Sequence, residues 1–317
     1  MSLDLSDTLV IGITSTALFD LSDADAVFRK KYDTNPGEAI QDYRKYMENH
    51  ETEDLAPGTG FPLVKALMSL NEFQIKNETP LIQIVVMSRN SPETGIRVFN
   101  NIRKQKLEIT RSAFTGGESV VDYLEAFDVD LFLTTNTKDA QKVIDSETCA
   151  VALVKNPPSS MAKNSEGQVR IAFDGDAVLF SDESEIVYKA EGLQKFQDTE
   201  DKKQDTPLND GPYAKLLKKL SRLQERLPHK VEYSPIRIAI VTARNSPAEM
   251  RVIKTLRHWG VYVDEVFFLG GLDKSKILKA FQPHIFFDDQ DIHLESASKL
   301  VPSGKVPHKS NSPLNTK

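Results

Sequence analysis

The chain is poor in the features that mark secreted, membrane and zinc-finger proteins. It has one cysteine, Cys149, among 317 residues, so no disulfide bond can form within it and no cysteine-rich zinc site is possible. It contains no apolar run of the about 18 residues that a membrane-spanning helix needs. Its first residues lack the basic and apolar segments of a secretory signal. We therefore expect a soluble protein of the cytoplasm.

No excess of positive charge is present either. The 40 Lys and Arg residues face 46 Asp and Glu residues, and the net charge of −6 excludes a strongly basic nucleic-acid-binding domain. The six histidines show no metal-like spacing, no Ser-His-Asp order stands out, and the phosphate-binding pattern G-x-x-x-x-G-K is missing. The length and the 39% of hydrophobic residues fit about two globular domains.

The sequence carries an internal repeat. Residues 82–95, IQIVVMSRNSPETG, match residues 236–249, IRIAIVTARNSPAE. At the same offset, the TGG at 115–117 matches the LGG at 269–271, and other matches before and after keep the same order. Because the matches follow one order along the chain, we predict a tandem duplication of one fold.

Both copies alternate strand and helix patterns. In the second copy we predict strands at 168–173, 236–241, 263–269 and 284–287 and helices at 213–227 and 248–259. In the first copy we predict strands near 8–13, 80–87 and 129–134 and helices near 61–73, 92–105 and 117–126. Strands that are apolar on both faces and alternate with helices indicate an α/β fold with parallel sheets covered on both sides.

Composition also predicts where the copies begin and end. The Pro- and Ser-rich residues 155–167 predict a linker between the first copy, residues 1–154, and the second copy, residues 168–302. Residues 191–207 are polar and charged, which indicates an excursion into solvent. Residues 303–317 are rich in Ser, Pro and Lys, and we expect a flexible tail there.

Polar and charged residues follow each predicted strand of the second copy. In chain order they are Asp174, Gly175 and Asp176, then Thr242, then Lys274, then Asp288 and Asp289. Because ligands bind beyond the carboxyl ends of parallel strands, we expect these side chains to meet at one edge of a sheet.

The first copy does without this charged set. In place of the acidic pairs it has Thr14 with Thr16 and Thr134 with Thr135, and Val120 stands in the place of Lys274. Since the same fold needs none of these charges, we infer that the second copy has them for chemistry.

Two residues of the loop after the second strand have counterparts in both copies. Thr242 corresponds to Ser88, and Arg244 corresponds to Arg89. For Arg244 the sequence leaves two roles open, a structural ion pair and a contact with phosphate.

This order of motifs resembles the haloacid dehalogenase (HAD) superfamily of phosphohydrolases. The strings AFDGDAVLFSDE at 172–183, VTAR at 241–244 and HIFFDDQ at 284–290 are similar to the type I cytosolic 5′-nucleotidases. The first copy resembles that family at 48–67 and 115–117. The resemblance implies tandem HAD-like Rossmannoid domains, the first degenerate and non-catalytic.

The resemblance also implies a cap insertion in the second copy, at about residues 181–232. Such a cap covers the site and contributes to recognition of the base and ribose. Phe180 and Tyr213 could stack on a base, but aromatic residues at these places more often belong to the core.

The family's chemistry maps onto the charged set residue by residue. The resemblance implies that Asp174 is the nucleophile that forms an aspartyl phosphate and that Asp176 is the general acid and base. Thr242 and Lys274 would assist as catalytic residues. The implied phosphate-binding set is Gly175, Thr242, Ala243 and Lys274.

A carboxylate and a phosphate dianion repel each other, by about 4 kcal/mol per charge pair at 4 Å and an effective dielectric of 20. A cluster of acids therefore needs a divalent cation to hold this substrate, and hard oxygen ligands suit Mg²⁺. The family implies that Asp174, the Asp176 carbonyl and Asp288 bind the metal, and for Asp289 two roles stay open, a ligand through water and a residue that orients its neighbour.

We thus expect a Mg²⁺-dependent 5′-nucleotidase acting on AMP or IMP. One alternative is a HAD sugar-phosphate phosphatase or phosphotransferase, and another is a non-catalytic nucleotide-binding regulator. The expected partner is a small nucleotide, not nucleic acid or membrane. A homo-oligomer and a nucleotide effector, the latter bound near Ser88-Arg89-Asn90, stay open.

Overall fold

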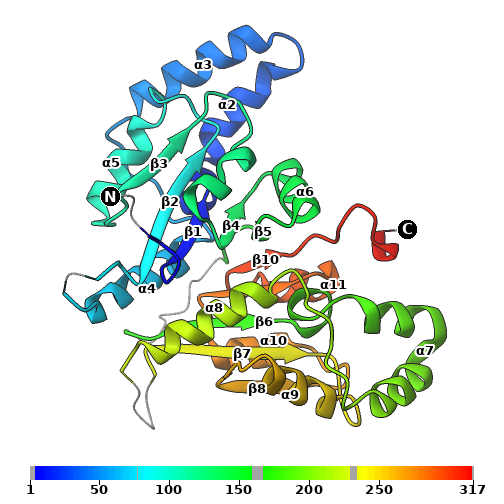
Figure 1. Cartoon of the computed structure of the whole chain (residues 1–317). Coiled ribbons are helices and arrows are strands. Elements are labelled where there is room, and N and C mark those ends of the chain that lie inside the picture. The colour runs from blue at the N-terminus through cyan, green and yellow to red at the C-terminus, as the bar shows by residue number, and fades with distance from the viewer. Residues whose placement is uncertain (1–3, 77, 159–166, 229–233, 316–317) are drawn as a thin grey trace.

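A computed structural model describes residues 4–76, 78–158, 167–228 and 234–315. These residues form one ten-stranded sheet in the order β3-β2-β1-β4-β5-β10-β9-β6-β7-β8, with helices on both faces (Figure 1). Neighbouring strands are parallel except at the centre, where β5 and β10 pair antiparallel. The predicted α/β fold with parallel strands is confirmed, but both parts of the chain share a single sheet.

The N-terminal part of the chain supplies one half of the sheet. Its strands are β1 (Leu9–Ile13), β2 (Ile82–Ser88), β3 (Arg111–Phe114), β4 (Leu131–Thr134) and β5 (Ala150–Val154). Its helices are α1 (Ser15–Leu18), α2 (Ser22–Tyr32), α3 (Pro36–Asn49), α4 (Phe61–Ser69), α5 (Ile96–Lys104) and α6 (Thr137–Ser146).

The C-terminal part supplies the other half. Its strands are β6 (Val169–Phe173), β7 (Ile236–Thr242), β8 (Glu265–Phe268), β9 (Ile285–Asp288) and β10 (Ser303–Lys305). Its helices are α7 (Glu183–Lys202), α8 (Ala214–Glu225), α9 (Glu249–His258), α10 (Ser275–Phe281) and α11 (Asp291–Ala297).

Both halves use the same strand order. Counted from the outer edge to the centre, the order is third, second, first, fourth and fifth strand in each half. Each half also carries a helical excursion after its first strand: α2 with α3 in one, and α7, broken at Gly192 (φ 83°), in the other. These excursions project from opposite ends of the molecule (Figure 1).

Alternating side chains of the strands fill cores on both faces of the sheet. On one face, Leu9 and Ile11 of β1 belong to the same continuous apolar cluster as Ile171 and Phe173 of β6. On the other face, Val10 and its neighbours form a cluster separate from that of the C-terminal half. The two halves are therefore joined by one common core beneath α4 and α8.

Two predicted segments differ from the structure. Residues 117–126 form two short 3₁₀ turns instead of an α-helix. Residues 191–207 lie largely in α7, where Phe196 and Glu200 are buried, so this segment is not simply solvated. Its buried acidic residue finds partners on other elements that the local sequence does not reveal.

The C-terminal residues begin as part of the sheet and not as a flexible tail. Ser303–Lys305 form β10, which pairs with β9 on one side and β5 on the other. Main-chain hydrogen bonds on both sides stabilise this short strand, which has no apolar run to predict it. The linker expected at 155–167 falls mostly on residues 159–166, which lie outside the described residues. Among the described helices, none combines the length and the hydropathy needed to cross a bilayer.

His284 and Asp130 have the same structural role in the two halves, because each accepts a hydrogen bond from a main-chain N–H of a neighbouring strand. His284 precedes β9 and accepts a hydrogen bond at Nδ1 from the Arg170 N–H of β6, 3.0 Å away. Asp130 precedes β4 and accepts one from the Val10 N–H of β1 at 2.9 Å. Burial lowers the pKa of His284 to about 4, because a protonated ring would lose its solvation, and the charge of Arg170 adds to the effect.

We predict that His284→Asn flattens the pH dependence of stability. Below the ordinary histidine pKa of 6.5 the unfolded chain binds a proton that the buried ring does not bind until its own pKa of about 4. The wild type therefore loses up to about 3 kcal/mol of unfolding free energy as the pH falls through this window. The Asn oxygen can still accept the Arg170 N–H but does not titrate.

Urea unfolding at about pH 7 and about pH 4.5 measures the difference. His258→Asn, at an exposed histidine ending α9, is the control for loss of a histidine outside the core. An equal loss of stability in the wild type and His284→Asn would show that His284 is not responsible.

Candidate active site

The carboxyl ends of four parallel strands meet at one edge of the sheet. β9, β6, β7 and β8 lie side by side, so the residues that follow Phe173, Thr242 and Asp288 come close together. Lys274 reaches the same edge because the loop after β8 leads into α10, which begins at the next residue. This edge holds the charged residues singled out in the sequence.

Lys274 bridges two buried aspartates. Its Nζ lies 2.9 Å from Asp174 Oδ1 and 2.7 Å from Asp288 Oδ2, and the three side chains are at most 6% exposed. Asp174 also accepts a hydrogen bond of 2.7 Å from the Gly175 N–H. Buried charges persist only with such close partners, so the loss of Lys274 would leave two carboxylates unpaired.

His293 of α11 joins this pair of aspartates. Its Nδ1 lies 3.1 Å from Asp288 Oδ2, and ligand atoms of Asp174, Asp288 and His293 all lie within 4.8 Å of one another. These three residues could hold a metal ion. The spacing of the histidines along the sequence did not predict a role for His293. The signal was its place in the first helical turns after the acidic end of a strand.

Asp289 is buried, and both of its carboxylate oxygens lack a hydrogen-bond donor among the described residues. The imidazole of His308 lies beside it, with Nε2 3.4 Å from Asp289 Oδ2, and burial lowers the pKa of His308, which disfavours a positive charge there. Burial, helped by the charges of Asp174 and Glu185, raises the pKa of Asp289 well above its ordinary value. An orphaned carboxylate in such a place fits a cation as its partner.

The site holds more negative than positive charge. Burial raises the pKa of Asp174 to about 7 against the opposing effect of Lys274, and the charge of Asp288 adds to the rise. Asp288 is also buried, but Lys274 and His293 outweigh this and hold its pKa below the ordinary value. The two carboxylates and Asp289 share one lysine, so a divalent cation would offset charge that the protein leaves uncompensated.

Asp176 points to an arginine. Arg244 donates from Nε to Asp176 Oδ2 at 2.8 Å and from Nη2 to Asp176 Oδ1 at 2.6 Å. Burial opposes the charge on Arg244, but Asp176 and Glu200 outweigh it and raise its pKa. Of the two roles that the sequence left open for Arg244, the structure shows the ion pair.

Thr242 and Gly175 face each other beside Asp174. Thr242 is buried, and a Cβ on Gly175 would lie 3.2 Å from its Oγ1, which leaves little space for any other residue. The Thr242 Oγ1 accepts a hydrogen bond of 3.2 Å from the Arg244 N–H. Ala243 follows at the surface.

The first half fills the equivalent place with neutral groups. Thr16 Oγ1 lies 3.2 Å from Thr14 Oγ1 and 2.6 Å from Thr135 Oγ1, so the hydroxyls bind one another. Val120, in the place of Lys274, is fully buried in the apolar core. This cluster has no charge to hold a cation or attack a phosphate.

Phe180 and Tyr213 belong to the core. Both side chains are fully buried, Phe180 against Trp259 and Tyr213 against Phe173 and Phe287. Neither is free to stack on a base, in agreement with the interpretation that the sequence favoured.

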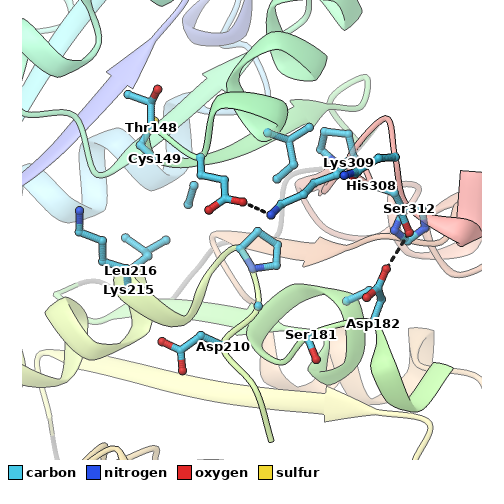
Figure 2. A pocket seen from close by; sticks show the side chains of 18 of the residues that line it. Thr148, Cys149, Ser181, Asp182, Asp210, Lys215, Leu216, His308, Lys309 and Ser312 are labelled. Atoms are coloured by element: carbon cyan, nitrogen blue, oxygen red, sulfur yellow. Dashed lines mark hydrogen bonds and ion pairs between the residues drawn. The ribbon is translucent and has the colours of Figure 1, made fainter. Parts of the chain in front are cut away.

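A cavity of about 490 Å³ lies beside this edge, between the two halves (Figure 2). His308 is part of its wall and also the neighbour of Asp289, so the cavity and the acidic edge share a side chain. Its volume is in the range typical of small-molecule sites. Labelled lining residues are Thr148 and Cys149 from the first half, Ser181, Asp182, Asp210, Lys215 and Leu216 from the second, and His308, Lys309 and Ser312 from the C-terminal segment.

Comparison with known proteins shows the family of the chain. The model of the 5′-nucleotidase family matches residues 1–313. The chain belongs to the 5′-nucleotidase family. Human cytosolic 5′-nucleotidase 1B is 38% identical over 300 residues, which are 93% of this chain and 48% of the human protein. This member of the family thus spans about half the length of that curated relative. No solved structure matches it significantly.

For this 5′-nucleotidase-family protein, we predict that Asp289→Asn raises stability in the absence of metal. The raised pKa means that the ionised carboxylate opposes folding at neutral pH, so its removal should add about 1 kcal/mol to the unfolding free energy. If Asp289 takes part in metal binding, the variant should also gain less stability from Mg²⁺ than the wild type, because the negative charge that would attract the cation is gone.

Thermal unfolding with Mg²⁺ and with EDTA measures both effects. Asp122→Asn is the control, since this exposed acid of the first half pairs with Lys142 at the surface, away from the acidic edge. If Mg²⁺ raises the Tm of Asp289→Asn as much as that of the wild type, Asp289 does not take part in metal binding.

Proposed function

We propose that this protein is a Mg²⁺-dependent 5′-nucleotidase of the HAD type that hydrolyses nucleoside 5′-monophosphates to a nucleoside and phosphate. The observation that carries the proposal is the buried Asp174–Lys274–Asp288 bridge with Asp176 two residues beyond Asp174. Family membership supports the same chemistry. The name of the human relative supports a cytoplasmic location.

The residues present fit a divalent cation. Asp174 and Asp288 would hold Mg²⁺ with the Asp176 carbonyl. Asp289, whose oxygens find no donor in the part of the chain that the structure describes, would bind it directly or orient its neighbour. When bound, the cation offsets the repulsion between the acids and the phosphate dianion. The nucleophile and the acid–base group of the reaction are side chains of the protein.

In the first step, an oxygen of Asp174 attacks the phosphorus and the bond to the ribose 5′ oxygen breaks. Asp176 gives that oxygen a proton, so the nucleoside leaves neutral. Lys274, Thr242 and the N–H groups around Gly175 hold the phosphoryl oxygens as charge builds up.

In the second step, Asp176 takes a proton from water, the water oxygen attacks the phosphorus, and the bond to Asp174 breaks. Phosphate leaves and the Asp174 carboxylate is restored. Splitting hydrolysis into two displacements allows one carboxylate to serve as acid and then as base.

AMP and IMP are the proposed substrates, and the cavity beside the acidic edge supports a nucleotide because it has room for a nucleoside. A sugar phosphate, or transfer of the phosphoryl group to another alcohol, would use the same catalytic groups. A purely regulatory role is less favoured, since the acidic set is complete in the second half.

We infer that the two halves are copies of one ancestral unit, of which residues 1–154 have lost catalysis. Equal strand order and the threonine cluster in place of the acids support this. Of the expected cap at 181–232, we assign the cap role to α7 alone. α8 packs its leucines into the common core as a sheet-covering helix, and residues 229–233 lie outside the described residues.

The test is phosphate release from AMP, IMP, other nucleoside monophosphates and sugar phosphates, with Mg²⁺ or EDTA. We expect Mg²⁺-dependent release from AMP or IMP, reduced by at least about 10³-fold in Asp174→Asn, which keeps the shape but not the nucleophile.

Asp122→Asn serves again as the matched control at an exposed acid and should keep wild-type rates. Release from sugar phosphates alone would keep the mechanism and overturn the substrate. No release from a folded wild-type protein would overturn the proposed activity.

A further inference from the structure

A buried chain of charged side chains connects α7 with Asp176. Arg244 donates hydrogen bonds to both carboxylate oxygens of Asp176 and, from Nη1, to Glu200 of α7. The other oxygen of Glu200 accepts from Arg251 Nη1 at 2.9 Å and from Ser184 Oγ at 2.9 Å. The side chains of Arg244, Glu200 and Arg251 are at most 4% exposed.

Stability alone gives little reason for such a chain. Removing several charges from water costs about as much as their attraction returns, and apolar packing would serve a fold as well. A guanidinium that binds a carboxylate through two parallel hydrogen bonds does something apolar packing cannot do: it fixes the position and plane of that carboxylate.

The second segment of α7 contacts the body of the protein through these linked charged side chains. Gly192, with φ 83° and ψ 177°, interrupts the helix. Between Leu193 and Lys202, which are all described, the buried residues are Phe196 and Glu200. Both contact Arg244, since the Phe196 ring centroid lies 5.4 Å from its Cζ. The seating of this segment and the placement of Arg244 are therefore linked.

The first half holds its own hairpin in a different way. Tyr43 of α3 donates a hydrogen bond of 3.0 Å to Asn90 Oδ1, in the loop after β2. Arg89 binds Asp139 of α6, and Thr16 occupies the place of Asp176. This hairpin thus contacts the body through a neutral hydrogen bond and through the Tyr46 ring, whose centroid lies 5.7 Å from Cζ of Arg97, whereas the loop arginine Arg89 binds a residue of α6. The charged link is found in the half that has an acid–base residue to position.

We propose that Arg244 and Glu200 are positioning residues for Asp176. Seating of the second segment of α7 against Arg244 fixes the Asp176 carboxylate beside the nucleophile, and loss of this contact frees it. The inference rests on the proposed function, because the position of Asp176 matters for catalysis only if the protein transfers a phosphoryl group.

The test is a double-mutant cycle with AMP as substrate. Glu200→Gln keeps the shape of the side chain but removes the charge that holds Arg244. We expect kcat to fall by about tenfold or more, with KM changed less than about twofold, because a positioned acid–base residue contributes about 10²–10⁴-fold. In an Asp176→Asn background, the same Glu200→Gln change should alter kcat by less than about twofold, since no acid–base group is left to position.

Tyr43→Phe is the matched control, since it removes the corresponding contact of the first half, and it should leave kcat unchanged. Phe196→Leu is a second variant for the same cycle. It withdraws the ring from Arg244 without leaving a buried charge unpaired, so it should fold even if Glu200→Gln does not. It should lower kcat in the same direction by a smaller factor.

The outcomes separate the two proposals. If the wild type hydrolyses no nucleoside monophosphate, the proposed function fails. If it does, an unchanged kcat in the folded variants overturns the positioning role. A loss of the same size in both backgrounds would show that Glu200 only supports the fold, and it would overturn the inference alone.

Discussion

The ammonium group of Lys274, held between Asp174 and Asp288, is the contact on which the site depends. Charges this deeply buried are stable only when each has a close partner, so the three side chains fix one another. They come from the ends of β6 and β9 and from the start of α10, and only a sheet with parallel neighbours brings these points to one edge. The fold serves the site by making this bridge possible.

The two halves show what the same architecture does without charge. Hydroxyls of Thr14, Thr16 and Thr135 satisfy one another where the second half has aspartates, and Val120 joins the core where Lys274 stands. The neutral cluster needs nothing from outside. The charged cluster contains acids with raised pKa values and an aspartate whose oxygens have no donor among the described residues, and these features fit a cation as a further partner.

The sequence predicted β1, β2, β4, β6, β7, β8 and β9 and the acids that follow the strands of the second half, because both follow from local patterns and from the repeat. It missed β3 and β5 of the first half. It did not predict β10, whose three residues are held by main-chain bonds to strands on either side. It also missed His293, His308 and Glu200, which reach the site from helices and from the C-terminal segment. Their roles arise from long-range contacts that no spacing along the chain displays.

The first half supports the position of His308. The segment after β10 crosses from one half to the other: Ser310 binds Asp145 of α6 at 2.6 Å, and Ser312 binds Asp182 at 2.6 Å. His308 lies in this segment, between β10 and Ser310, and its Nε2 is 3.4 Å from Asp289 Oδ2. α6 of the first half therefore anchors the segment that encloses the cavity and borders the acids. The first half thus shapes the cavity beside the acidic edge, and its loss would remove one wall of the cavity and the support of His308.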